Sequence, residues 1–315
     1  MKKTIIITGG LGHIGSYLIE NFLRKKNNLH LIIIDNLQSQ RYSSLFDLKL
    51  KGNKFSFYDL DLTKDSISDV VKNANLLIHL AAITDAENSV GKESLYKKNN
   101  LNCTKEVIKF CKKYNVPFIF PSSTSVYGKM KHNEILFEDN QKILYPQSPY
   151  ARIKLKEEEL IKQNFEDIRS IIIRLGTIVG KSKGMRFHTA VNKFCYQACM
   201  NKEITVWKSA YNQVRPYATL NDFYRIIDFF IKNEKFINNQ TYNLVTKNLT
   251  VKQIIDIIKI KKKINLIFVN SKIMNQLSYK VSNKKISNLG FRPINNIKRE
   301  IFETLKTFKF HNKIR

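Results

Sequence analysis

Residues 4–15 read TIIITGGLGHIG, and this stretch decides the fold of the chain. A short β-branched run that leads straight into glycine is typical of a strand buried on both faces. The glycines permit a tight turn, a close backbone approach to a pyrophosphate and close packing of the next helix on the strand. Free N–H groups at the start of that helix would bind phosphate oxygens. The residues expected to contact a dinucleotide here are Gly9, Gly12, His13, Ile14 and Gly15.

The next strand-like run, LHLIIID over residues 29–35, ends in an acidic residue. It lies about 20 positions after Gly15, where a carboxylate binds ribose hydroxyls and would repel a 2′-phosphate. The sequence therefore favours NAD over NADP, with Asp35 and Asn36 at the cofactor. Arg41 lies too far along the chain to be the usual ligand of a 2′-phosphate.

Strand-like and helix-like segments alternate through the first half of the chain, which predicts an α/β fold with a doubly wound parallel Rossmann sheet. The strand-like segments are 4–8, 29–35, 55–60, 76–82, 118–123 and 170–176. The helix-like segments are 13–27, 64–73, 93–115 and 148–166.

The regular alternation of strand-like and helix-like segments ends after Gly176. We expect an NAD-binding Rossmann domain over residues 1–176 and a smaller C-terminal α/β substrate lobe over 177–315, with some segments returning to the Rossmann domain. The expected helices of this part are 189–200, 222–233, 250–260 and 296–308, and residues 240–244 are expected to be extended.

Charge and hydropathy limit the classes of partner. The 315 residues include 54 Lys and Arg against 26 Asp and Glu, for a net charge of +28. Such a charge suits nucleic-acid or membrane binding, but the lysines are scattered, and the densest basic run, 259–263, has no interleaved aromatic residue. No apolar run approaches the roughly 20 residues needed to cross a bilayer. We therefore expect an anionic small-molecule substrate, and neither a nucleic acid nor a membrane as partner.

The four cysteines indicate a reducing compartment. Cys103, Cys111, Cys195 and Cys199 show no CxxC spacing and no nearby histidine cluster. They predict reduced thiols in a cytoplasmic protein, without a disulfide framework or a metal site.

Tyr150 and Lys154 are four residues apart and would share one face of a helix. A phenol, with a pKa of about 10, is a poor base at neutral pH, and a neighbouring ammonium favours its phenolate form. Lys154 is also suited to hold a nicotinamide ribose. The strand at 118–123 ends in a run of hydroxyl residues, 122–125, and parallel strands present these ends to the ligand crevice. We predict that Tyr150 is the acid–base group and that a hydroxyl of this run binds the substrate oxygen.

Taken together, these segments resemble the extended short-chain dehydrogenase/reductase family, in its NAD-dependent nucleotide-sugar epimerase/dehydratase branch. The resemblance covers residues 4–230 and, more weakly, 289–293. The segments that carry it, in family order and spacing, are 8–15, 35–37, 61–62, 79–82, Asn100, 122–128, 149–154, 174–176 and 215–222.

The resemblance implies roles for individual residues. Ser123 would be the catalytic hydroxyl, with Ser122 as the next candidate. Asp61 would contact the adenine, with Asp59 as the alternative. The further cofactor-contacting residues would be Leu62, Leu80, Ala81, Ala82, Asn100, Tyr150 and Lys154. The substrate-contacting residues would be Ser123, Thr177, His188, Asn192 and Arg215, of which Arg215 would bind the diphosphate.

The family's shared first step is oxidation of the sugar, usually at C4, with Tyr150 taking the hydroxyl proton and NAD the hydride. The 4,6-dehydratases usually carry Asp-Glu after the catalytic hydroxyl, whereas this chain has Thr124-Ser125, which disfavours dehydration. Ser, Tyr, Lys and NAD suffice for a 4-epimerase and equally for a 4-dehydrogenase that releases a 4-keto sugar. A non-catalytic NAD-binding scaffold and a nucleic-acid-binding protein are the less favoured alternatives.

Family members often dimerise by pairing two long helices from each subunit. The segments 93–115 and 148–166 are the candidates here, so we expect a homodimer. A monomeric mass in solution would contradict this expectation.

Overall fold

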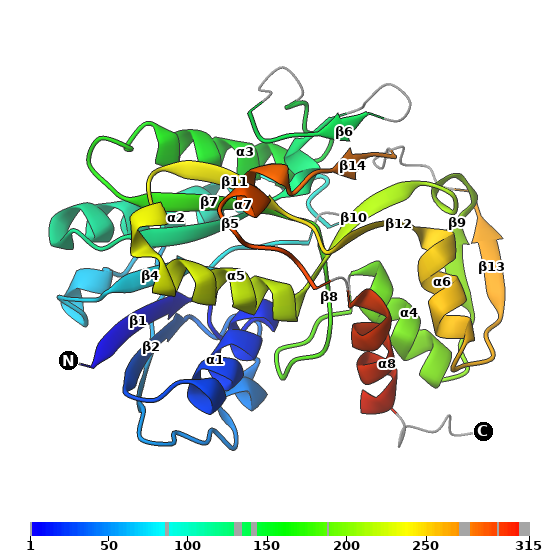
Figure 1. The fold of residues 1–315 in the computed structure, drawn as a ribbon, viewed down its shortest axis with the longest axis horizontal. Helices are drawn as coiled ribbons and strands as arrows, with labels where there is room; N and C mark the ends of the chain where they lie inside the picture. Colours follow the sequence, from blue (N-terminus) through cyan, green and yellow to red (C-terminus); the bar gives the residue numbers. More distant parts are fainter. Residues whose placement is uncertain are drawn as a thin grey trace.

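A seven-stranded sheet, in which all neighbouring strands are parallel, forms the centre of the molecule (Figure 1). The computed structural model describes residues 2–85, 88–128, 134–139, 144–187, 189–270, 278–294 and 296–308. In spatial order the strands are β11 (Gln240–Leu244), β7 (Ser170–Leu175), β5 (Phe118–Ser123), β4 (Leu76–His79), β1 (Lys3–Thr8), β2 (Leu29–Asp35) and β3 (Lys54–Asp59). The doubly wound parallel Rossmann sheet expected from the sequence is confirmed.

Helices cover both faces of this sheet, which explains its continuous apolar runs. Side chains alternate along a strand, so Ile5 and Ile7 of β1 pack into one buried cluster and Ile6 into another. The first cluster includes residues of α1 and α5, and the second residues of α2 and α3. These helices are α1 (His13–Lys25), α2 (Glu93–Tyr114), α3 (Pro149–Lys162) and α5 (Leu220–Lys232).

The strand order reverses beside β1, because β2 and β3 lie on one side of it and β4, β5, β7 and β11 on the other. In open parallel sheets a crevice forms at such a point, outside the carboxyl ends of the strands. The sheet topology therefore places a binding crevice beyond the ends of β1 and β4.

The C-terminal part contributes to two regions of the fold. Strand β11 belongs to the central sheet, where it pairs with β7. A separate group of elements, right of the sheet in Figure 1, packs α4, α6 and α8 around its own core. This group contains β8 (Thr177–Val179), β9 (Ile204–Trp207), β10 (Val214–Thr219), β12 (Lys247–Thr250), β13 (Leu266–Val269), α4 (Ala190–Cys199), α6 (Val251–Lys259) and α8 (Ile297–Thr307). The remaining elements are β6 (Ile135–Leu136), β14 (Lys280–Val281) and α7 (Lys284–Asn288).

The helix expected at residues 64–73 is wrong, because this segment contains only a 3₁₀ turn, Ile67–Asp69. The side chain of Ser66 accepts the N–H of Ser68, and Glu106 of α2 accepts both the Ser66 hydroxyl and the Ile67 N–H. Side chains therefore satisfy the backbone groups that a longer helix would have paired. The other 3₁₀ turns among the described residues are Tyr42–Leu45, Thr124–Val126, Lys208–Ala210 and Glu234–Phe236.

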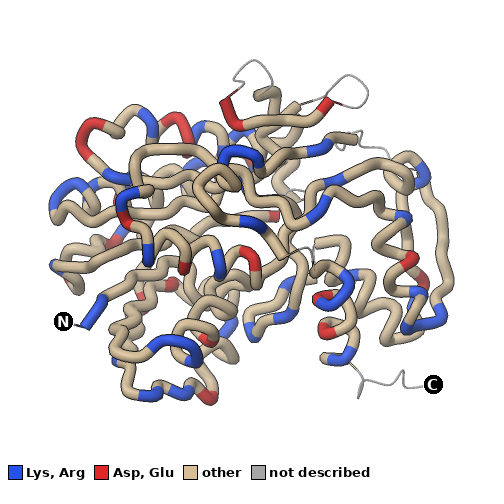
Figure 2. The backbone as a smooth tube through the Cα atoms, in the orientation of Figure 1, with Lys and Arg blue, Asp and Glu red and all other residues tan. Residues whose placement is uncertain are grey.

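Lys and Arg are distributed along both the sheet region and the C-terminal group of elements (Figure 2). Within the described ranges, no helix is long and apolar enough to cross a membrane. The four cysteines are free and buried.

Candidate active site

A cavity of about 770 Å³ lies at the carboxyl ends of the central strands. Asp35 at the end of β2, Leu80 after β4 and Ser123 at the end of β5 line it, together with Thr177 and Arg215 from the C-terminal part. This volume is typical of a small-molecule or cofactor site. The sequence-predicted residues that line it are Gly9, Gly12, His13, Ile14, Gly15, Asp35, Asn36, Leu62, Leu80, Ala81, Ala82, Ser123, Tyr150, Lys154, Thr177 and Arg215.

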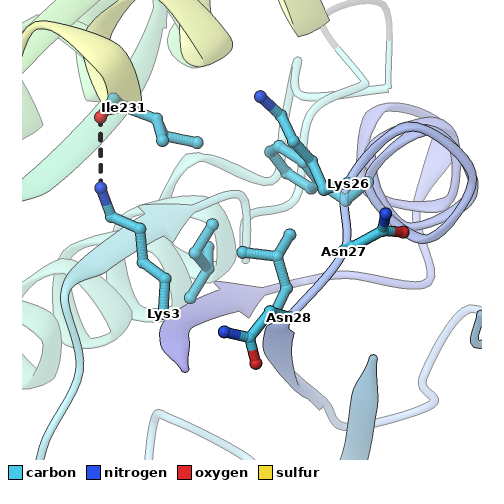
Figure 3. A pocket seen from close by; sticks show the side chains of 8 residues that line it. Lys3, Lys26, Asn27, Asn28 and Ile231 are labelled. Atoms are coloured by element: carbon cyan, nitrogen blue, oxygen red, sulfur yellow. Dashed lines mark hydrogen bonds between the residues drawn. The ribbon is translucent and has the colours of Figure 1, made fainter. Parts of the chain in front are cut away.

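A second cavity, of about 260 Å³, lies at the opposite ends of β1 and β2 (Figure 3). Lys3 and Leu29, the first residues of these strands, line it together with Asn28, and Lys3 Nζ donates a hydrogen bond to the carbonyl oxygen of Ile231 at 3.2 Å. Ligands of parallel sheets bind at the carboxyl ends of the strands, and this cavity is at the amino ends. The larger cavity is therefore the candidate site.

The glycine turn after β1 is shaped so that only a residue without a side chain fits its first position. Gly9 has φ +63°, and a Cβ there would lie 2.6 Å from the backbone nitrogen of Ala81. Its N–H donates to the Ile34 carbonyl at 2.7 Å, which holds the turn against β2. Helix α1 starts next, with Gly12 as its N-cap and no capping side chain. Uncapped N–H groups beside the cavity fit the phosphates of a dinucleotide.

Asp35 lies beside this turn. Its two carboxylate oxygens accept the N–H groups of Leu11 and Leu37, both at 3.0 Å. Burial raises the pKa of Asp35, and these two hydrogen bonds and the nearby Arg41 act in the opposite direction. The backbone N–H groups of Leu11 and Leu37 therefore fix the orientation of the Asp35 carboxylate.

Helix α3 places Tyr150 and Lys154 in the cavity. Its N-cap is Ser148, whose hydroxyl accepts the Ala151 N–H at 3.2 Å, and Pro149 occupies the first turn, so Tyr150 lies at the start of the helix. Ser123, at the end of β5, lines the same cavity and acts to lower the pKa of Tyr150. The structure therefore brings the three predicted catalytic side chains together, from two elements.

The charge environment of Tyr150 is mixed. Burial raises its pKa above the usual value, Lys154 and Arg186 act to lower it, and Glu157 acts to raise it further. The expected effect of Lys154 is present, but burial outweighs it. Deprotonation of Tyr150 therefore depends on positive charge close to the phenol.

Three buried polar atoms on residues of the cavity wall have no hydrogen-bond partner among the described residues: Ser122 Oγ, Thr189 Oγ1 and Arg215 Nε. Arg215 Nη2 donates to Gln213 at 2.8 Å, and the guanidinium lies 5.9 Å from the centre of the Tyr279 ring. Burial lowers the pKa of Arg215. A buried guanidinium with a free donor is suited to bind phosphate oxygens.

Arg186 was not predicted from the sequence, although it lines the cavity beside Tyr150. Burial and the charge of Arg41 lower its pKa to about 10, and it donates to the Thr84 hydroxyl. The loop before α4 carries it there, because Gly184 packs directly against the backbone of the glycine turn and leaves no space for a side chain. The sequence signal was weak: a glycine two residues before an arginine in a loop.

Three predicted residues do not line the cavity, although they contact or adjoin residues that do. Asn100 binds both backbone groups of Ile83, at 2.8 and 3.1 Å. Asn192 donates to the Arg186 carbonyl at 3.2 Å and contacts His13. Asp61 accepts the N–H and the hydroxyl of Thr63. His188 lies outside the described residues.

Comparison with known proteins places the chain in a family. It is 28% identical over 274 residues to dTDP-D-glucose 4,6-dehydratase of Dictyostelium discoideum, covering 81% of the chain and 62% of that protein. It is 33% identical over 182 residues to UDP-glucose 4-epimerase of Schizosaccharomyces pombe, covering 54% of the chain and 49% of that protein. The matched regions therefore span about half to two thirds of these relatives.

Solved structures share the whole fold. UDP-N-acetylglucosamine 4-epimerase of Methanobrevibacter ruminantium M1, in complex with UDP-N-acetylmuramic acid, matches with a TM-score of 0.85 at 21% identity, covering 98% of this chain and 99% of that one. UDP-glucuronic acid 4-epimerase of Bacillus cereus, in complex with UDP-glucuronic acid and NAD, matches with a TM-score of 0.84 at 24% identity, covering 97% and 99%. Residues 5–244 match the model of the NAD dependent epimerase/dehydratase family. The chain belongs to this family, whose cofactor is NAD.

Proposed function

We propose that the chain is a nucleotide-sugar 4-epimerase, which removes a hydride from sugar C4 and returns it to the opposite face. The observation that carries this proposal is the meeting of Ser123, Tyr150 and Lys154 in the same cavity as the glycine turn and Arg215. The two structural relatives described above are 4-epimerases by name, which supports the choice.

Each side chain would have a defined task. Tyr150 would take the proton of the C4 hydroxyl and later return it, while Ser123 would hydrogen-bond the same oxygen. Lys154 would hold the nicotinamide ribose and favour the phenolate form of Tyr150. When bound, NAD supplies the hydride acceptor. The glycine turn would hold its diphosphate, and Asp35 its adenosine ribose.

The charges on the wall support an anionic substrate. The cavity is lined by the cations Arg41, Lys92, Lys154, Arg186 and Arg215, and by only two carboxylates, Asp35 and Asp85, among the described residues. Cations in a low-dielectric cleft concentrate anionic ligands. We propose that Arg215 binds the diphosphate of the nucleotide sugar through its unpaired Nε.

Dehydration is disfavoured by the residues after Ser123. Thr124 lies 3.4 Å from the Tyr279 hydroxyl, and Ser125 donates to Ser123 at 2.8 Å. Neither hydroxyl is an acid–base group at neutral pH, which the removal of water from C5 and C6 requires. A 4-dehydrogenase that releases a keto sugar needs the same residues as the epimerase and is the alternative.

The product identifies the reaction. We would incubate the purified protein with NAD and a panel of nucleotide sugars, then measure product mass and retention. Unchanged mass with altered retention is expected for a 4-epimerase. Loss of two hydrogens would show a dehydrogenase, and loss of water would overturn the argument from Thr124 and Ser125. No product with any substrate would favour the non-catalytic scaffold.

Replacing Asp35 by alanine is expected to weaken NADH binding by roughly tenfold or more, because a charged hydrogen-bond acceptor is lost. Discrimination against NADPH should also decrease, because the repelling charge is removed. Fluorescence titration with both cofactors measures this. Asp69→Ala, at an exposed carboxylate, is the control. An unchanged preference for NADH in Asp35→Ala would show that Asp35 does not bind the cofactor.

We also propose a cytoplasmic homodimer, with residues 1–176 as the NAD-binding domain and 177–315 as mainly the substrate lobe. Helices α2 and α3 pack side by side on one face of the sheet, as a contact through paired helices would require. A solution mass of one chain would contradict the dimer.

A further inference from the structure

A buried carboxylate lies directly behind Lys154, one helical turn along α3. Glu157 is 0% exposed and Lys154 is 3% exposed. Glu157 Oε2 lies 3.1 Å from Lys154 Nζ, which also lies 4.4 Å from the centre of the Phe120 ring. Lys154 lines the cavity, whereas Glu157 does not. The Glu157 carboxylate can therefore act on the site only through its contact with Lys154 and through the electric field of its own charge.

Neighbouring elements hold Glu157 in place. Thr104 of α2 donates to Glu157 Oε1 at 2.8 Å, and Thr104 lies 3.2 Å from His79 Nε2 of β4. His79 Nδ1 in turn lies 2.8 Å from the Thr8 hydroxyl. Burial lowers the pKa of His79 to about 3, so the imidazole is neutral at physiological pH. Glu157 therefore receives a neutral hydrogen bond on one oxygen and a cation on the other.

Lys154 is the cation that compensates the negative charge of Glu157. Glu157 Oε2 accepts no well-aligned hydrogen bond from the described residues, so the ion pair is its compensation. A buried ammonium without a counter-charge loses its proton easily, because burial disfavours the charged form. Glu157 thus favours the ammonium form of Lys154, which the proposed reaction needs beside Tyr150.

The same carboxylate acts on Tyr150 in the opposite sense. Its negative charge disfavours the phenolate, as does burial. The other groups facing Tyr150 are Lys154, Arg186 and Ser123, together with Tyr96 of α2. Burial raises the pKa of Glu157, Lys154 and Thr104 act to lower it, and Glu158, itself paired with Arg174, acts to raise it. Cys103 of α2 also faces both Glu157 and Lys154. Glu157 therefore links Thr104 of α2 to Lys154.

We propose that Glu157 is a positioning residue that keeps Lys154 protonated and sets the pH range in which the Tyr150–Lys154 pair works. The part of this proposal that concerns turnover rests on the proposed function. The effect on protonation does not, because it depends only on the buried charges. Removing one negative charge makes every nearby acid lose its proton at a lower pH.

The test compares Glu157→Gln with the wild-type protein. In the variant, Lys154 is expected to lose its proton at a pH lower by about one unit or more, because its counter-charge is gone. NMR of ¹³Cε-labelled lysine follows this titration, with the Lys154 signal assigned by its absence in Lys154→Met. The Phe120 ring helps to separate that signal from those of exposed lysines.

A pH profile of kcat/KM, with the substrate that the panel assay identifies, gives the second measurement. Both limbs of the bell are expected to move to lower pH in Glu157→Gln by about one unit or more, since both limbs report the coupled Tyr150–Lys154 pair. A merely structural role would reduce the height of the profile without moving its limbs. If the wild-type protein turns over no substrate, the proposed function fails while the NMR titration still decides this inference.

Three further variants complete the design. Glu157→Asp, which keeps the charge, should restore both titrations, and Glu159→Gln, at an exposed carboxylate on the same helix, should leave them unchanged. Glu157→Met, also uncharged, replaces Glu157→Gln if that variant does not fold. An unchanged Lys154 titration in the uncharged variant, or a shift to higher pH, would overturn the proposal.

Discussion

Turnover of the nucleotide sugar is expected to fall by about a hundredfold or more in Tyr150→Phe, because the variant lacks the acid–base group. The phenyl ring keeps the packing of Tyr150 at the start of α3, and Lys154 keeps its ion pair with Glu157. NADH binding should therefore stay within about twofold of the wild-type value, since no predicted cofactor contact other than the phenol is removed. Steady-state kinetics measures the first quantity, and fluorescence titration the second.

A matched substitution separates loss of the proton acceptor from a general effect on the helices. Tyr114 ends α2, where its ring packs against Phe110 at 5.1 Å, and it does not line the cavity. Tyr114→Phe should leave kcat close to the wild-type value. If Tyr150→Phe retained near wild-type kcat, Tyr150 would not be the base. A parallel loss of NADH binding would indicate that the phenol holds the cofactor rather than the proton.

The free energy of unfolding is expected to decrease by about 3–5 kcal/mol in Arg174→Met, because a buried carboxylate loses its partner. Arg174 is 1% exposed and Glu158 is 0% exposed. The guanidinium donates to both oxygens of Glu158, from Nε at 3.0 Å and from Nη2 at 2.7 Å. Lys162 lies 3.6 Å from one of these oxygens, which is a weaker and partly exposed contact. Urea unfolding followed by circular dichroism measures the change.

The double variant Arg174→Met/Glu158→Leu tests the reason for that loss. Apolar residues of similar volume can replace a buried ion pair at little cost, so the double variant should recover most of the stability. If the single and double variants were equally destabilised, lost packing against Tyr127, whose ring centre lies 4.9 Å from the guanidinium, would explain the effect instead. A single variant as stable as the wild-type protein would show that Glu158 is neutral when alone.

Local sequence was sufficient for the parts of the site that form within one strand, turn or helix. The stretch 4–15 predicted β1, the turn and α1, because a strand that ends in glycine and leads into a helix allows few backbone paths. The four-residue spacing of Tyr150 and Lys154 predicted that both lie on one face of a helix, because residues four apart in a helix share a face. These residues line one cavity, while their roles stay predictions.

Local sequence failed where side chains from elsewhere complete the hydrogen bonding. Residues 64–73 carry a helix-like pattern, but Glu106 of α2 takes the Ile67 N–H and the Ser66 hydroxyl. Propensity describes a segment by itself, and a carboxylate that arrives from a distant helix lies outside that description. The result is one 3₁₀ turn in place of the expected helix.

The sequence by itself therefore determined the family, the parallel sheet, the cofactor class and the residues of each local motif. Only the tertiary structure decided which charges meet in the cavity. Arg186 reaches Tyr150 because Gly184 packs on the glycine turn, more than 160 residues earlier in the chain. Glu157 is a buried partner of Lys154 rather than a solvated helix residue because Thr104 of α2 covers it. Burial and pairing are set by contacts between distant segments, and they decide what a charged side chain does.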